Sequence, residues 1–346
     1  SNGVVQSCPS LLLEPASTNL IEYSNFESGW TLLSGGSFAY NQTISPEGIQ
    51  NASILSGDGV NGNSIYDSIS LSVQSYTFSV FAKQKDVSVI SLKGFSSGAA
   101  GTSKYNLSNG TIDTTSSGQF SDEKIEDYGN GWYRCSVKVT ATSSGSKLLG
   151  FAGENSDSGE LFSIYGAQLE ALSYATSYIP TNGSSQTRAA ETCFGAGNAS
   201  TFSDSEGVLY AEISALANPT GQEIALCISE GQSGVNRLLI RMKTDGAIGM
   251  VLRVANTTEA SINSGVLNQL SNHKVAVKWK VNDIALWIDG VEVGTDSSAN
   301  VFSANTLDEV SFNQGNNSNQ FYGKTRDLRV YNEALTDAQL QTLTTL

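Results

Sequence analysis

The chain has 346 residues, of which 39% are hydrophobic and only 15% are charged, a balance and length that suit two domains. Its 33 Asp and Glu outnumber 19 Lys and Arg, giving a formal net charge of −14. This balance excludes nucleic acid as an expected partner, because a phosphate-backbone binder needs a basic surface. No apolar run approaches the ~20 residues of a membrane span, so membrane insertion is not expected either.

The first half of the chain is dominated by strand patterns. Segments 76–83, 132–139 and 161–169 are strand candidates, and 76–83 and 132–139 alternate with a period of two, which is typical of half-buried antiparallel strands. In 132–139 this alternation places Tyr133 and Cys135 on one face and Trp132 and Arg134 on the other. We therefore expect the Tyr133 face to be the core face.

The second half has clearer hairpins. Segments 237–243 and 247–254 flank Asp245-Gly246, and segments 284–288 and 291–293 flank Asp289-Gly290. An Asp-Gly pair between alternating runs favours a two-residue type I′ turn, in which both residues take positive φ. Segment 273–281 is a further strand candidate.

One helix is predicted, at the C-terminus. Thr336 occupies the N-cap position and Gln339 the third helical position, which together form a capping box. Alternation lapses between 180 and 201, where the sequence becomes small and polar, and resumes at 207. The expected fold is all-β, with two β-sandwich (jelly-roll) domains in tandem and a short C-terminal helix. The expected domains are 1–190 and 202–346, joined by a linker over 191–201.

Several motifs in the first half occur in a recognisable order. They are Leu-Leu-Glu-Pro-Ala-Ser-Thr-Asn-Leu at 12–20, Asp-Tyr-Gly-Asn-Gly-Trp-Tyr-Arg at 127–134, Tyr-Gly-Ala-Gln-Leu-Glu at 165–170, Ala-Thr-Ser-Tyr-Ile-Pro-Thr at 175–181 and Thr-Arg-Ala-Ala at 187–190. Residues 11–190 thereby resemble a module common in bacteriophage and prophage tail and head-fibre proteins, which is similar to carbohydrate-binding jelly rolls. The resemblance implies a location in a virion or outside the cell, with a homo-oligomer or other virion proteins as partners.

The second half resembles a laminin-G-like, concanavalin A-like jelly roll over 202–346. The resemblance rests on 273–279, on Leu-Trp-Ile-Asp-Gly at 286–290, and on the long segment 321–340. It implies the fold more than the function, since this sandwich serves lectins, adhesion modules, glycosidases and lyases.

The charged residues of the second half suggest a binding surface. The alternation of each strand places several Lys and Arg residues on the face opposite the apolar residues, which we expect to point outward. If these strands share one sheet, the cations form a basic strip beside an outward Trp. The candidate carbohydrate-binding residues are Arg237, Arg241, Lys243, Arg253, Lys278, Lys280 and Trp287. Arginine forks suit carboxylates, and an exposed Trp suits the apolar face of a sugar. The alternative is that these charges are solvated and discourage strand aggregation.

A secondary carbohydrate-binding surface is expected in the first half. Trp132 and Arg134 share an outward face, and Tyr128 lies in a Gly-flanked loop. Aromatic residues in loops at the end of a sandwich often bind ligands, but they also cap cores, and both interpretations stay open.

Catalytic and metal-binding signals are weaker. His273 is the single His and shares parity with the core residue Val275, so a structural role is favoured over catalysis. No cofactor is required by the sequence, and calcium is left open because oxygen-rich turns contain Asp58, Asp67, Asp157, Asp204, Asp296 and Asn316. Four dispersed cysteines (Cys8, Cys135, Cys193 and Cys227) exclude a zinc ribbon, and a Cys8–Cys193 bridge stays open.

The leading functional hypothesis is glycan recognition without catalysis. The chain is then a segment of a phage or prophage fibre that attaches to a cell-surface or extracellular polysaccharide, which the basic strip predicts to be anionic. The alternatives are a polysaccharide lyase or glycoside hydrolase on the second jelly roll, with the first as its binding module, and a purely structural virion protein.

Overall fold

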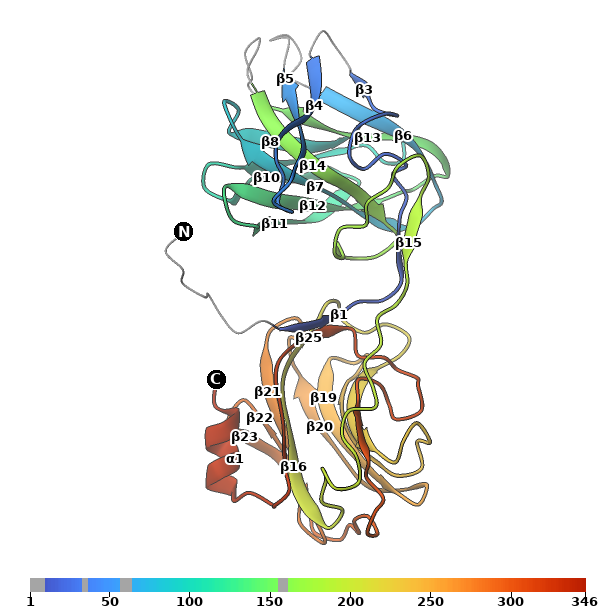
Figure 1. Ribbon diagram of the computed structural model, residues 1–346, viewed down its shortest axis with the longest axis vertical. Helices are drawn as coiled ribbons and strands as arrows, with labels where there is room; N and C mark the ends of the chain where they lie inside the picture. Colours follow the sequence, from blue (N-terminus) through green and yellow to red (C-terminus); the bar gives the residue numbers. More distant parts are fainter. Residues whose placement is uncertain (1–9, 33–36, 57–63, 155–160) are drawn as a thin grey trace. The chain divides into compact units, whose positions relative to one another are not determined.

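The computed structural model describes residues 10–32, 37–56, 64–154 and 161–346. The chain divides into two compact units. The first domain is Ala16–Ala189, and the second domain combines Ser1–Pro15 with Ala190–Leu346. Each domain is a pair of packed antiparallel sheets (Figure 1). The expected all-β fold, with two sandwich domains and a short C-terminal helix, is confirmed.

The first domain contains two six-stranded sheets. The β8 sheet has the order β10-β9-β8-β13-β6-β3, and the β7 sheet has the order β11-β12-β7-β14-β5-β4. The strands of the β8 sheet are β3 (Thr31–Leu32), β6 (Ser64–Leu71), β8 (Val89–Gly94), β9 (Gly101–Asn106), β10 (Thr111–Gly118) and β13 (Gly145–Gly153). Those of the β7 sheet are β4 (Ser37–Ile44), β5 (Gln50–Ser56), β7 (Ser75–Gln84), β11 (Phe120–Asp127), β12 (Trp132–Thr140) and β14 (Leu161–Glu170).

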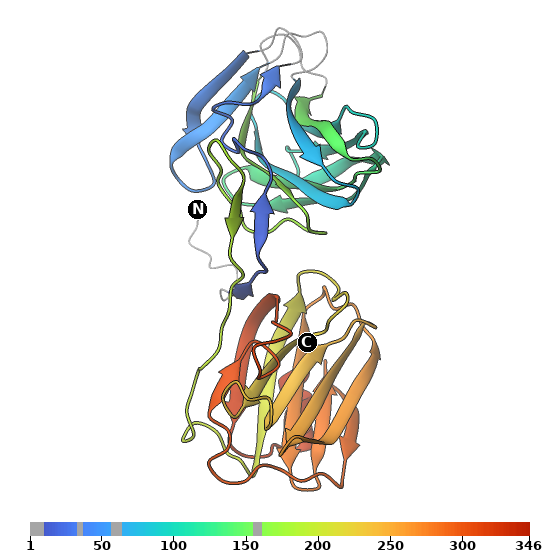
Figure 2. The same ribbon diagram turned by 90° about the vertical axis from the view of Figure 1, so that its right-hand side faces the viewer.

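The core of the first domain follows the predicted alternation. Phe78 and Val80 of β7, Cys135 and Val137 of β12, and Phe151 of β13 are fully buried in one cluster between the two sheets. A separate two-stranded pair, β2 (Ser17–Asn19) with β15 (Gln186–Arg188), joins the two ends of this domain (Figure 2).

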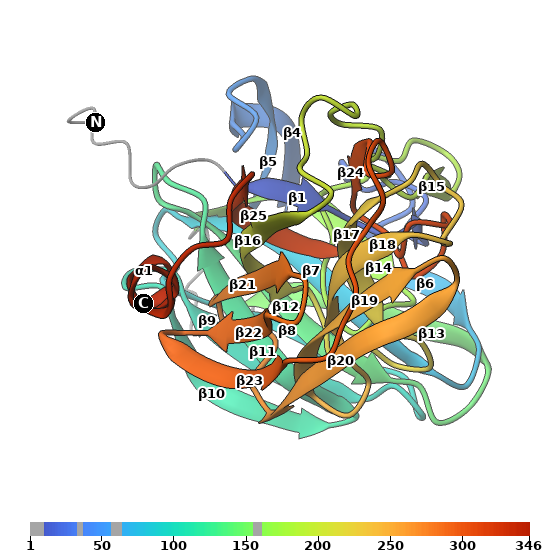
Figure 3. The same ribbon diagram turned by 90° about the horizontal axis from the view of Figure 1, so that it is seen from below.

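The second domain packs a six-stranded sheet against a five-stranded one (Figure 3). The β16 sheet has the order β1-β25-β16-β21-β22-β23, and the β18 sheet has the order β20-β19-β18-β17-β24. The strands of the β16 sheet are β1 (Leu11–Leu13), β16 (Glu206–Ala215), β21 (His273–Lys280), β22 (Ile284–Ile288), β23 (Val291–Asp296) and β25 (Gly323–Tyr331). Those of the β18 sheet are β17 (Ile224–Ser229), β18 (Arg237–Met242), β19 (Ala247–Val254), β20 (Thr257–Val266) and β24 (Glu309–Ser311).

The core of the second domain also has the predicted parity. Leu238 and Ile240 of β18 meet Val275, Val277 and Trp279 of β21 in one buried cluster. A smaller buried cluster lies on the opposite face of the β16 sheet, where α1 (Asp337–Thr344) packs Leu340 against that sheet. The capping box predicted at the start of α1 is present.

The two predicted Asp-Gly turns have different geometries. Asp289 and Gly290 have φ of 51° and 82°, as a type I′ turn between β22 and β23 requires. In Asp245-Gly246 only Gly246 takes positive φ. The loop between β18 and β19 begins at Lys243, whose N–H donates to the carbonyl of Ala247 and whose carbonyl accepts from the N–H of Gly246. The prediction of a type I′ turn at Asp245-Gly246 is therefore wrong.

The structure places the domain boundaries differently from the expected 1–190 and 202–346. Strand β1, which the expected first domain contained, pairs with β25 in the second domain, with Leu12 opposite Lys324 (Figure 1). The expected linker 191–201 runs along β24, where Ala196 and Val310 exchange hydrogen bonds. Alternation could not reveal these two features, because a three-residue edge strand such as β1 and an isolated bridge such as Ala196–Val310 are too short to show a period.

Candidate functional site

The predicted basic strip is divided between two sheets. Arg237, Arg241 and Arg253 lie on β18 and β19, with Lys243 directly after β18, whereas Lys278, Lys280 and Trp287 lie on β21 and β22. The two sheets pack face to face around the core, so their outward faces point away from each other. The condition for a single basic strip, that these strands share one sheet, is not met.

The two lysines of the β16 sheet are ion-paired, and Lys278 is also buried. Lys278 is 6% exposed and its Nζ lies 2.6 Å from Asp283 Oδ1, and Lys280 Nζ lies 2.8 Å from Glu206 Oε2. Trp287 is 6% exposed and packs in the cluster beneath α1. The expectation of an exposed Trp platform is wrong, because the C-terminal helix covers the face that parity marked as outward.

Two cations of the β18 sheet also have acidic partners. Arg241 Nη1 lies 3.2 Å from Glu223 Oε2, and its Nη2 donates to Ser261 and Asn263. Lys243 Nζ lies 2.8 Å from Asp245 Oδ2. These pairs neutralise the charge at this end of the β18 sheet.

Arg237 and Arg253 differ from the rest of the set. They are register partners on β18 and β19, and Arg237 Nη1 donates to the carbonyl of Gln314 at 2.7 Å. The buried Nε atoms of Arg237, Arg253 and Arg241 all lack a hydrogen-bond partner, but unlike Arg241 neither Arg237 nor Arg253 forms an ion pair with a described carboxylate. Burial lowers the pKa of Arg237, and repulsion by Arg253 lowers it further. Arg237 is 6% exposed and Arg253 is half-buried, so the outward face of the β18 sheet holds two neighbouring guanidinium groups without an ion-paired carboxylate, and Arg253 is the more accessible of the two.

The predicted secondary residues of the first domain are mostly buried. Trp132 and Arg134 are each 2% exposed, although both lie on the outward face of the β7 sheet. Trp132 Nε1 donates to the carbonyl of Ile44, and Arg134 Nη1 donates to that of Thr176 at 2.6 Å. Tyr128 is 46% exposed. The segment 171–182 crosses this face and covers Arg134, which the strand pattern could not show.

The sequence motifs that close the first domain form the network that holds this crossing segment. The Glu170 carboxylate accepts hydrogen bonds from Ser17 Oγ at 2.6 Å and from the N–H of Thr176 at 3.0 Å. Gln168 Oε1 accepts from the N–H of Ile179 at 2.7 Å, and Asn19 Nδ2 donates to the Ile179 carbonyl at 2.9 Å. Because Glu170, Gln168 and Asn19 are fully buried, these motifs build a fixed surface over the β7 sheet.

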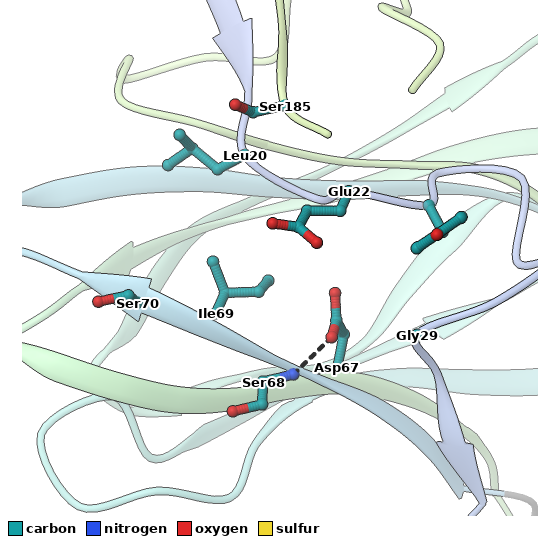
Figure 4. A pocket seen from close by; sticks show the side chains of 9 residues that line it. Leu20, Glu22, Gly29, Asp67, Ser68, Ile69, Ser70 and Ser185 are labelled. Carbon is teal, nitrogen blue, oxygen red and sulfur yellow. Dashed lines mark hydrogen bonds between the residues drawn. The ribbon is translucent and has the colours of Figure 1, made fainter. Parts of the chain in front are cut away.

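A hollow of about 270 Å³ lies beside β6 in the first domain. Figure 4 shows the carboxylates of Glu22 and Asp67 pointing toward one another across it. Burial raises the pKa of Asp67, the hydrogen bond from the Ser68 N–H (2.7 Å) opposes this, and the charge of Glu22 adds to the rise. Two facing carboxylates can accept hydrogen bonds from hydroxyl groups.

A second hollow, of about 290 Å³, lies between the turn that joins β4 to β5 and the crossing segment. We call it the Tyr165–Tyr178 hollow. The two rings are 5.2 Å apart at an angle of 65°. Carboxylates and amides complete its lining, chiefly Glu27, Glu47, Asn51 and Asn182. Sequence reasoning missed this set, since its members come from four separate segments that only the tertiary fold brings together.

His273 and the calcium candidates have structural partners. His273 Nδ1 lies 2.6 Å from Asp289 Oδ2, and its Nε2 lies 3.0 Å from the carbonyl of Asn268. Asp204 accepts from three successive backbone N–H groups at 305–307, and Asp296 from Ser298. Asp58, Asp157 and Cys8 lie outside the described residues. Within the described ranges no group of three His, Cys, Asp or Glu side chains is arranged to hold a metal ion.

Cys135 and Cys227 are fully buried, Cys135 on the face that the alternation marks as the core face. The Cys8–Cys193 bridge that the sequence left open lies outside the described residues because of Cys8. Among the described helices none is both long and apolar enough to cross a membrane.

Residues 201–341 match the family described as the concanavalin A-like lectin/glucanases superfamily (Laminin_G_3). The resemblance expected of the second half is thereby confirmed for this stretch. No protein of curated function matches the sequence.

Solved structures similar to this chain include a sialidase module from Ruminococcus gnavus, titled as the CBM40 of its IT-sialidase bound to α2,3-sialyllactose. It has 18% identity and a TM-score of 0.36, and the match covers 45% of this chain and 97% of that one. A SAP-like pentraxin from Limulus polyphemus has 19% identity and a TM-score of 0.33, covering 40% and 69%. A leech intramolecular trans-sialidase has 20% identity and a TM-score of 0.35, covering 42% and 24%.

Proposed function

We propose that this protein recognises glycans, and that the outward face of the β18 sheet binds an acidic sugar unit. The observation that carries the proposal is the pair of adjacent arginines, Arg237 and Arg253, which have no carboxylate partner among the described residues. A partly desolvated charge without an opposite charge in contact is costly, so a guanidinium that lacks a carboxylate partner is suited to an external anion.

The chemistry of the guanidinium defines the ligand class. A carboxylate or sulfate group accepts two parallel hydrogen bonds from one arginine, and such charge-assisted bonds are stronger than neutral ones. Arg241 is already paired with Glu223. Of the predicted carbohydrate-binding residues, Arg237 and Arg253 are therefore the two that remain available to bind an acidic sugar. Lys278, Lys280 and Trp287 are assigned to packing and to ion pairs of the β16 sheet instead.

Retention on acidic polysaccharide tests this proposal. The intact chain, Arg253→Gln and the double variant Arg237→Gln/Arg253→Gln are run through gels containing polygalacturonate, heparin or neutral dextran. We expect the acidic polymers alone to retard the intact chain, and the double variant to lose about tenfold in affinity, or about 1.4 kcal/mol. Added salt weakens binding, because exposed charge contacts are screened within about 8–10 Å.

The matched control is Lys280→Gln, which removes one positive charge from the opposite sheet. Its affinity should stay within about twofold of the intact chain, since Lys280 lies on β21 of the other sheet, and its exposed ion pair contributes little to folding. Equal, salt-insensitive retention on dextran and on acidic gels would refute the proposal, as would a double variant that binds as well as the intact chain.

We also propose that the chain is a segment of a phage or prophage fibre, located in a virion or outside the cell, with a second copy or other virion proteins as partners. The support is the set of motifs over 11–190. An antibody against the chain should label particles that the source strain releases after prophage induction. Particles without label would count against this context and leave the glycan proposal intact.

A further inference from the structure

We propose that the Tyr165–Tyr178 hollow of the first domain is a second binding site and that it takes an uncharged sugar ring. This proposal is independent of the arginine pair, because the two sites lie on different domains and select ligands of different charge.

The walls of the hollow are fixed before any ligand arrives. Tyr178 Oη lies 2.7 Å from Ser24 Oγ. Ser24 in turn exchanges hydrogen bonds with Thr181: the Ser24 N–H donates to Thr181 Oγ1 at 3.0 Å, and the Thr181 N–H donates to Ser24 Oγ at 2.8 Å. Tyr165 is 4% exposed and belongs to the buried cluster on the same face. A site whose side chains are already ordered loses little conformational entropy on binding.

The polar groups of the hollow suit hydroxyls. Asn51 Nδ2 donates to Glu47 Oε2 at 3.2 Å, whereas the buried Oδ1 of Asn51 has no partner. Burial raises the pKa of Tyr165 above its ordinary value and that of Tyr178 to about 12, so both phenols stay protonated at neutral pH. The hollow thus offers carboxylate and amide acceptors beside phenolic hydroxyls, and a sugar hydroxyl can both donate and accept.

The charge of the lining selects the ligand. Glu27 and Glu47 contribute two carboxylates, and the described residues that line the hollow include no Lys or Arg. A uronate or sulfate would be repelled, which leaves an uncharged polyhydroxyl compound. The half-buried ring of Tyr178, which packs edge-on against Tyr165, gives the apolar C–H face of a sugar ring an aromatic surface to pack on.

Calorimetric titration of the full chain with uncharged oligosaccharides tests the site. The probes are cellohexaose, maltohexaose, mannohexaose and galactohexaose, each up to about 10 mM, a range that covers weak complexes of about −3 to −4 kcal/mol. We expect at least one to bind, and both Tyr178→Phe and Glu47→Gln to weaken it by about tenfold. Each variant removes one polar function and leaves the carbon framework unchanged, and Glu47 lies on an exposed turn, so folding should be retained.

Two controls separate this site from the other one. Glu126→Gln removes an exposed carboxylate of β11, outside the hollow, and should bind the neutral probe normally. Arg237→Gln/Arg253→Gln should do the same. The proposal is overturned if no probe binds, if Tyr178→Phe and Glu47→Gln bind normally, if the arginine variant loses the neutral probe, or if calcium alone binds at the hollow.

Discussion

The ring of Tyr178 packs so close to Gly166 that a side chain at position 166 would press against it. A Cβ built on Gly166 would lie 3.2 Å from Tyr178 Cε2 and 3.1 Å from Phe81 Cδ2, and Gly166 has a φ of 61°. The same residue lies in the irregular stretch of β14 where its register with β7 shifts. The glycine of the Tyr-Gly-Ala-Gln-Leu-Glu motif therefore permits both the left-handed backbone and the close packing of the tyrosine over the strand.

Replacing that glycine should loosen the hollow. We expect Gly166→Ala to lower the free energy of unfolding by about 2–4 kcal/mol, of which about 1–2 comes from the left-handed backbone and the rest from displacing Tyr178. Gly129→Ala is the control, since Gly129 also has positive φ (77°) but nothing within 4 Å of its Cβ position. Urea denaturation of both variants measures the difference, and equal losses would show that the ring contact contributes nothing.

The N-terminal strand should stabilise the second domain and not the first. Leu13 is 6% exposed in the core of the second domain, whereas Leu11 on the same strand is 42% exposed. We expect Leu13→Asp to destabilise the second domain by about 2–5 kcal/mol, because it buries a charge in an apolar cluster, and Leu11→Asp to have little effect. Hydrogen exchange read by mass spectrometry should accelerate in β25 peptides for Leu13→Asp alone. Faster exchange confined to β7 peptides would contradict the assignment.

The strand patterns predicted the core correctly and the outer faces poorly. The inward parity of Leu238, Val277 and Phe78 agrees with the structure, because each sheet has one partner sheet and alternation reports that contact directly. For the second face of each sheet, alternation shows only that it does not line the core, and not whether it is exposed or covered by another element. Trp287 beneath α1 and Arg134 beneath the crossing segment show how a covering element, distant in sequence, buries a face that parity marks as outward.

Glu154 should make the first domain sensitive to acid. Burial opposes its ionisation, but hydrogen bonds from Lys104, Lys93 and Ser91 outweigh burial and lower the pKa of the carboxyl from 4.5 to about 2. The folded-state pKa lies below the unfolded value, so the stabilisation is complete above pH 4.5 and is lost as the pH falls toward 2. We expect a contribution of about 2–3 kcal/mol at neutral pH.

The variant Glu154→Gln isolates this contribution. It should be less stable than the intact chain at pH 6 and nearly as stable at pH 2.5, which calorimetric scans at the two pH values would measure. A stability difference that does not change between them would mean that ionisation of Glu154 has no part in it.

His273 should act in packing rather than in catalysis. Both ring nitrogens already face protein oxygens, those of Asp289 and Asn268. We expect His273→Asn to cost about 0.5–3 kcal/mol of stability and to leave glycan affinity unchanged. Incubation with alginate, pectate and glycosaminoglycans, followed by absorbance of unsaturated uronate ends, should show no activity in the intact chain. Robust activity that the variant loses by about 10²–10⁴-fold would instead identify a lyase.

The candidate sites were only partly visible in the sequence. Arg237 and Arg253 were predicted by parity, because both lie on strands whose inward residues are apolar. Their lack of counter-charge depends on which acids the fold brings near, and that is a tertiary property. The Tyr165–Tyr178 hollow had no sequence signal of its own, since Tyr178 comes from an irregular segment whose course is set by buried hydrogen bonds.

The first domain begins and ends at points that are neighbours in space, although they are far apart in the sequence. Within the first domain, Thr18 and Thr187 are opposite each other in the β2–β15 pair. Within the second domain, the N–H of Glu191 donates to the carbonyl of Glu14 at 3.0 Å. Residues 16–189 therefore form an insertion between β1 and the rest of a single jelly roll. A short turn joining Glu14 to Glu191 should leave the host sandwich intact, and a different module with paired ends could be spliced in at the same place. The second sandwich thus acts as a scaffold whose inserted domain can be exchanged without redesign of the sandwich that carries it.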